Sequence, residues 1–202
     1  ASPPICASAI TLSQVTLANA PAGLLMIWCM IAPELGGDLE LGRTKLTIWA
    51  TTFLLLPALG FWLFRTSSQG VANLAYLFWT GAWVLFALHA YWAVFIIFDG
   101  VADTFVQQGT VIAGGNFLLL GLWTLDVLMI WLLPARMQSF WVQSIVRLIA
   151  FLIFAGTLVV LRGGAIQVLG FVFTGTLVIA ALVRAIVQVP AHKLEAHHGQ
   201  AG

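Results

Sequence analysis

The sequence predicts an all-α integral membrane protein that folds as a polytopic helical bundle. Of its 202 residues 61% are hydrophobic and 7% are charged, and the mean hydropathy is +1.04. A soluble core could not bury this much apolar surface. Apolar stretches of about 20 residues recur along the chain, and this length crosses the hydrocarbon layer of a bilayer. The net charge of +1, without a cluster of Lys and Arg, argues against nucleic-acid binding.

Five membrane spans are expected, and together they make residues 45–189 one five-helix bundle. They cover roughly residues 45–64, 71–98, 110–133, 143–161 and 165–189. The breaks between them read "RTSSQG", "DGVADTFVQQG", "PARMQSF" and "RGG", each with Gly, Pro or charge. Because these loops are short, neighbouring helices should run antiparallel.

Residues 1–44 are expected to form an extramembrane segment with one interfacial or re-entrant helix. Between Pro21 and Pro33 only about ten apolar residues run without interruption, which is short for a span. The alternative is a sixth span that starts near Val15 and moves the N-terminus to the opposite face.

Two cysteines fall in this N-terminal segment. Cys6 and Cys29 could form a disulfide in an oxidising compartment, or both could remain free, buried thiols. The sequence leaves both alternatives open.

The distribution of Lys and Arg predicts the orientation. One side of the five-span topology holds Arg65, Arg136, Arg147, Arg184 and Lys193, and the other holds Arg43, Lys45 and Arg162. The positive-inside rule then places the C-terminus in the cytoplasm, and we expect a bacterial inner or intracytoplasmic membrane. Residues 190–202 form the expected tail, whose three histidines have no spacing specific for zinc.

The first candidate site lies in "HAYWAVFIIFDGVAD", where His89 falls within the hydrocarbon layer. If the helix continues, Asp99 and Asp103 emerge on the same face as an outer acidic rim. A polar group at this depth should face protein, a cofactor or water. Asn116 and Thr157 lie at a similar depth and are the expected hydrogen-bond partners. The alternative makes His89 the axial ligand of a haem or chlorophyll-type pigment.

The second candidate is a charged cluster on the inner side of the membrane. Asp126, Arg147 and Arg184 fall at one depth on three successive spans. Because an unpaired charge is costly there, Asp126 should pair with one or both arginines. The alternative is that the arginines extend to the headgroups and Asp126 bonds elsewhere.

The motifs of several enzyme classes are absent from the sequence. No CxxC, Walker loop, Rossmann glycine pattern, HExxH or internal repeat occurs. The nine Trp residues suggest an aromatic belt, with Trp62, Trp79, Trp131 and Trp141 near the inner interface. We therefore expect a non-catalytic accessory or scaffold subunit of a photosynthetic or respiratory membrane assembly, with other membrane subunits and lipids as partners. A small permease is the alternative, and a single-histidine pigment protein comes third; a pigment or a lipid is the expected kind of bound molecule.

Overall fold

The computed structural model describes residues 10–35, 39–133, 139–161 and 163–198, and these residues form helices without any strand. The α-helices are α1 (Leu12–Ile31), α2 (Leu39–Phe64), α3 (Gln69–Tyr91), α4 (Val101–Gln108), α5 (Thr110–Leu132), α6 (Phe140–Gly156) and α7 (Ala165–His198). Three short segments complete them: the 3₁₀ turn η2 (Ala32–Leu35) and the π-helical turns η3 (Trp92–Ile97) and η5 (Thr157–Leu161). The predicted all-α bundle is confirmed.

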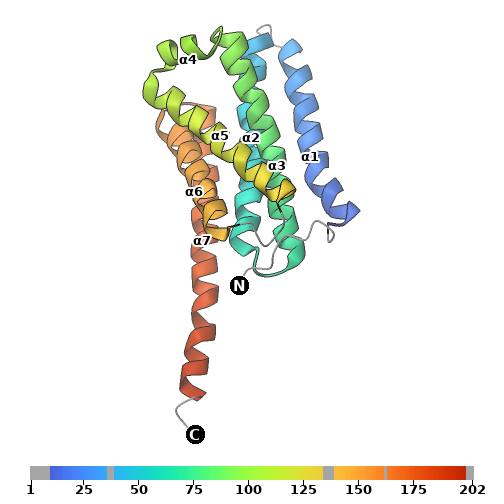
Figure 1. Cartoon of the computed structure of the whole chain (residues 1–202), viewed down its shortest axis with the longest axis vertical. Coiled ribbons are helices and arrows are strands. Elements are labelled where there is room, and N and C mark those ends of the chain that lie inside the picture. Colours follow the sequence, from blue (N-terminus) through green and yellow to red (C-terminus); the bar gives the residue numbers. More distant parts are fainter. Residues whose placement is uncertain (1–9, 36–38, 134–138, 162, 199–202) are drawn as a thin grey trace.

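Six of the described helices are long and apolar enough to cross a membrane: α1, α2, α3 with η3, α5, α6 with η5, and α7 up to Val187. Consecutive spans alternate in direction, so α1 begins at the end of the bundle where α7 leaves it (Figure 1). We call this the Arg65 end, because Arg65 follows α2 there, and we call the opposite one the α4 end. Beyond Val187, α7 continues as a helix to His198, so most of the predicted tail is helical.

The N-terminal segment differs from the expectation of an interfacial or re-entrant helix. Thr11 starts α1 with a capping box in which its side chain and that of Gln14 satisfy each other's backbone N–H groups. Pro21 lies inside the helix and does not end it, so α1 reaches 20 residues with a mean hydropathy of 1.4. The boundary expected at residue 44 is also wrong, because α2 already begins at Leu39.

The polar stripe expected to run from His89 to Asp103 is interrupted. The α-helix ends at Tyr91 and passes into η3, after which Asp99 and Gly100 take positive φ values of 56° and 127°. This turn sends α4 along the end of the bundle (Figure 1). Asp99 and Asp103 are exposed at the α4 end, as an acidic rim requires, but they do not continue the helix face of His89.

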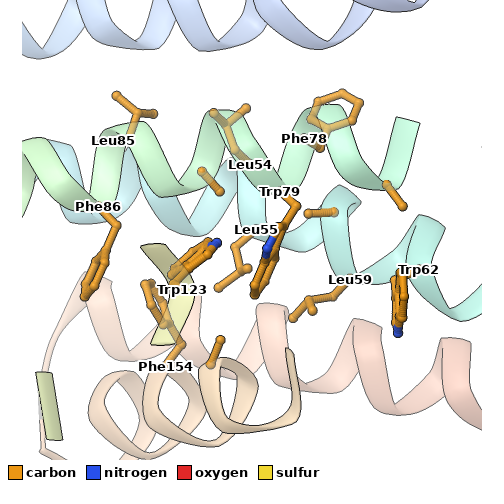
Figure 2. Close-up of a cluster of buried hydrophobic side chains, with 14 of the residues drawn as sticks. Leu54, Leu55, Leu59, Trp62, Phe78, Trp79, Leu85, Phe86, Trp123 and Phe154 are labelled. Atoms are coloured by element: carbon orange, nitrogen blue, oxygen red, sulfur yellow. The ribbon is translucent and has the colours of Figure 1, made fainter. Parts of the chain in front are cut away.

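The centre of the bundle is aromatic. Figure 2 shows the buried Leu54 and Leu55 of α2 beside rings from α3, α5 and α6. The Trp79 and Trp123 rings lie 4.4 Å apart between centroids, and Phe86 follows at 5.5 Å from Trp123. Between membrane helices such close packing, and not exclusion from water, supplies most of the attraction.

Helix α7 packs against η5 through Gly170. A Cβ atom at this position would lie 2.7 Å from the Cβ of Leu158 and 2.9 Å from its carbonyl carbon. Neither of these atoms is the end of a flexible side chain, so only glycine allows this approach. Gly175, five residues further along the same helix, has open space where its Cβ would be.

These two glycines make a matched pair of substitutions. We expect Gly170→Ala to lower the thermal stability of the purified protein, since α7 must move away from Leu158. Gly175→Ala should be neutral or slightly stabilising, because alanine favours a helix over glycine by about 0.8–1 kcal/mol. Thermal unfolding in detergent measures both, and equal effects of the two variants would contradict the packing of α7 described here.

Candidate functional site

Helices α5 and α6 each place one charged residue on a packed stripe. The buried residues recur at alternating spacings of three and four: Leu119, Trp123, Asp126 and Ile130 on α5, and Gln143, Arg147, Ala150 and Phe154 on α6. This spacing keeps a stripe on one face of a helix. Asp126 and Arg147 are therefore carried into the interior, where they expose 0% and 3% of their surfaces.

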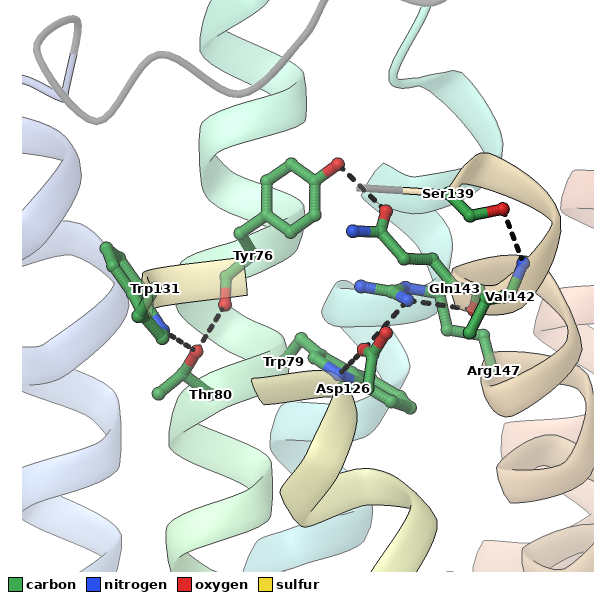
Figure 3. A network of polar contacts seen from close by, with 9 residues as sticks. All are labelled: Tyr76, Trp79, Thr80, Asp126, Trp131, Ser139, Val142, Gln143 and Arg147. Carbon is green, nitrogen blue, oxygen red and sulfur yellow. Dashed lines mark hydrogen bonds and ion pairs between the residues drawn. The ribbon is translucent and has the colours of Figure 1, made fainter. Parts of the chain in front are cut away.

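The two charged side chains form an ion pair at the centre of a hydrogen-bond network (Figure 3). Nη1 of Arg147 lies 3.1 Å from Oδ2 of Asp126 and also donates to the carbonyl of Gln143 at 2.8 Å. The indole Nε1 of Trp79 donates to the same carboxylate oxygen at 2.8 Å. The predicted pair of Asp126 with an arginine forms, and the arginine is Arg147.

Aromatic rings from α2 and α3 surround the guanidinium group of Arg147. Its central carbon lies 3.9 Å from the ring centroid of Trp62, 4.6 Å from that of Trp79 and 5.7 Å from that of Tyr76. The hydroxyl of Tyr76 donates to Oε1 of Gln143 at 3.3 Å. A desolvated cation over a ring gains about 2 kcal/mol or more, which helps to offset the cost of burying this charge.

Asp126 was expected to pair with one or both arginines, and it pairs with one. Arg184 lies half-buried on α7 and makes no ion pair with Asp126. The assignment of Trp62 and Trp79 to an aromatic belt was wrong. Trp62 and Trp79 expose 6% and 0% of their surfaces, so they belong to the interior and not to an aromatic belt. Trp131, at 40% exposed, keeps the exposure that a belt residue should have.

Three indole groups link α3 to α5. The N–H of Trp79 donates to Asp126, that of Trp83 to the Thr124 hydroxyl at 3.0 Å, and that of Trp131 to the Thr80 hydroxyl at 2.9 Å. Each of these two hydroxyls donates a hydrogen bond to the backbone carbonyl one turn earlier in its own helix. Sequence reasoning missed these links, although a buried indole N–H usually finds an acceptor; the N–H of the buried Trp123 has none among the described residues.

His89 is hydrogen-bonded to α2. Its Nδ1 lies 2.8 Å from the carbonyl oxygen of Thr44 and 3.4 Å from the hydroxyl of Thr47. A carbonyl only accepts, so Nδ1 carries the proton, and in the neutral ring Nε2 is then the acceptor nitrogen. The expectation of Asn116 and Thr157 as partners was wrong, since in the described part of the chain no hydrogen bond joins either of them to His89.

The remaining polar atoms of the site are few. Oδ1 of Asp126, Nη2 of Arg147 and Nε2 of Gln143 are buried without a hydrogen bond. Among the described residues no three His, Cys, Asp or Glu side chains gather as a metal site. Cys29 is a free, buried thiol, whereas Cys6 lies outside the described residues.

The ion pair predicts an order of stability among charge variants. Asp126→Asn should lower the stability by about 3–5 kcal/mol, because Arg147 is left buried without a counter-charge. Arg184→Gln should cost much less, since Arg184 has no share in this pair. Thermal unfolding and folded yield in detergent measure both variants.

The double variant Asp126→Asn with Arg147→Gln provides the control. It removes both charges, so it should be more stable than Asp126→Asn alone. A double variant as unstable as the sum of the two single ones would contradict a coupled pair.

His89→Leu tests the link between α2 and α3. We expect a loss of about 0.6–1.7 kcal/mol, the range found for hydrogen bonds between membrane helices. Any visible absorption of the purified protein should stay unchanged. An absorption band lost without a change in stability would show instead that His89 holds a pigment.

Comparison of the chain with models of protein families, with curated proteins and with solved structures finds no match.

Proposed function

We propose that this protein is a non-catalytic accessory or scaffold subunit of a larger membrane assembly. The observation that carries the proposal is the separation of its interior polar groups. One group joins His89 to α2, and the other joins Asp126 to α3 and α6. Each holds helices of this chain together, as a structural role requires.

Packed rings lie between these two groups. Phe86 stacks on His89 at 6.2 Å between ring centroids and contacts Trp123 at 5.5 Å. Phe154 approaches both Phe86 and Trp123, at 5.7 and 6.3 Å. A permease needs polar stations or water through the whole membrane depth. An aromatic block at this position favours a subunit over a permease.

The outer helices offer surface for a partner. In α1 and α7 only 11% and 17% of the most apolar window is buried against the rest of the chain. On α7 Phe171, Val178 and Leu182 are about half-exposed, and the helix projects past the bundle at the Arg65 end (Figure 1). We expect α7 to carry the contact, because partner helices could pack on it inside the membrane and other chains beyond it.

The kind of assembly and the orientation belong to the same proposal. A respiratory or photosynthetic complex is the proposed kind of assembly, and exposed rings such as Trp141 and Phe171 offer large rigid side chains for packing against its other subunits. Arg65, Arg147 and Arg184 lie toward the Arg65 end, whereas Arg43 and Lys45 lie toward the α4 end. The positive-inside rule then puts the Arg65 end and the end of α7 in the cytoplasm.

Mild detergent extraction from native membranes tests the proposal. We expect this chain in a particle much larger than its own 21.8 kDa, together with other membrane proteins. The visible absorption spectrum of that particle reveals whether haem or pigment belongs to it. A colourless particle of this chain alone would overturn the proposal and favour a permease, to be examined by flux assays on Asp126 and His89 variants.

A matched pair of variants tests the role of α7. Leu182→Ser should release the chain from the large particle, because it places a hydroxyl in the expected contact. Leu125→Ser on α5 is the control, since the two leucines are 58% and 59% exposed. Equal retention of both variants in the particle would contradict a contact through α7.

A further inference from the structure

Arg65 is almost completely buried although it follows the last residue of a membrane helix. It exposes 8% of its surface, and its Nη1 donates to the carbonyl of Trp62 at 2.7 Å. Its guanidinium carbon lies 4.1 Å from the ring centroid of Trp62 and 4.4 Å from that of Phe140. The Nε atom is buried and has no hydrogen-bond partner. These contacts fix the position of the side chain, but its hydrogen-bond donors are not all used.

A second arginine faces the same region from α7. Gly170, Phe173, Leu177 and Ala180 mark the packed stripe of this helix at spacings of three and four, and Arg184 is the next residue on it. Arg184 is half-buried and lies three residues before Val187, where the span ends. Burial and then repulsion from Arg184 lower the pKa of Arg65 to about 10, so Arg65 remains charged at neutral pH.

Among the described side chains near Arg65, the positive charges exceed the negative ones. Arg147 and Arg184 both lie close enough to repel Arg65, and Asp126 is already paired with Arg147. In the described part of the chain neither Arg65 nor Arg184 has a carboxylate within ion-pair distance. Two guanidinium groups at the membrane surface that have no counter-charge among the described residues attract an anion.

We propose that Arg65 and Arg184 bind the phosphate of an anionic phospholipid headgroup at the Arg65 end, between α2, the start of α6 and α7. Guanidinium groups match phosphate oxygens with paired hydrogen bonds. Both arginines lie where their spans end, at headgroup level. Beside Arg184, Val183, Ile186 and Val187 expose apolar surface along which an acyl chain can lie. Because this apolar surface lies directly beside the arginine, a lipid is favoured over free phosphate.

Lipid binding to the full chain in nanodiscs provides the test. We expect native mass spectrometry to find phosphatidylglycerol retained on the wild type in preference to phosphatidylcholine. Arg184→Gln should weaken this preference by about fivefold, the effect of one basic residue at a membrane surface. Lys45→Gln, which removes an exposed cation at the α4 end, should leave the preference unchanged. Because Arg65→Gln could impair folding, Arg65→Lys is used, and it should weaken binding while the chain stays folded.

Three outcomes would overturn the proposal. In the first, the wild type retains both lipids equally. In the second, Arg184→Gln and Lys45→Gln behave alike. In the third, inorganic phosphate added in phosphatidylcholine nanodiscs stabilises the wild type as much as phosphatidylglycerol does, which would identify a site for the free anion.

Discussion

The packing of four helices depends on one carboxylate oxygen, Oδ2 of Asp126. It lies on α5, accepts the indole hydrogen of Trp79 on α3 and pairs with Arg147 on α6. Arg147 in turn contacts the ring of Trp62 on α2. Four helices thus meet around one buried ion pair. Where water is excluded, such a charge restricts the arrangement more than apolar packing does, because a shifted register would leave it without a partner.

The positions of most spans, and the depth of residues along them, could be predicted from the sequence. Hydropathy locates the spans because each must supply an apolar length that matches the bilayer. Depth along the helices also brings Asp126 and Arg147 to one level, and the cost of an unpaired charge predicts that they meet. The prediction failed at α1, where Pro21 suggested an end. Inside a membrane helix proline is tolerated, since neighbouring groups satisfy the freed carbonyl.

Rotation about each helix axis was harder to predict. His89 and Asn116 share a depth, yet His89 faces α2, because the direction of a side chain depends on which helices become neighbours. The same holds for Trp62 and Trp79, which depth alone assigns to the interface and packing assigns to the interior. The turn between η3 and α4 depends on Asp99 and Gly100, whose positive φ values no periodic pattern reveals. The charges that surround Arg65 likewise could not be predicted from the sequence, because they depend on which helices become neighbours.

The ion pair joins consecutive helices, and this has a consequence for biogenesis. Asp126 and Arg147 are 21 residues apart and lie on the consecutive helices α5 and α6. A helix that enters the bilayer with one of these charges unpaired meets a penalty of about 2.5–3.5 kcal/mol. If α5 and α6 leave the translocon as a hairpin, each neutralises the other before the rest of the bundle is present. The pair would then first lower the cost of inserting α5 and α6 into the membrane, and only later contact α2 and α3 in the complete bundle.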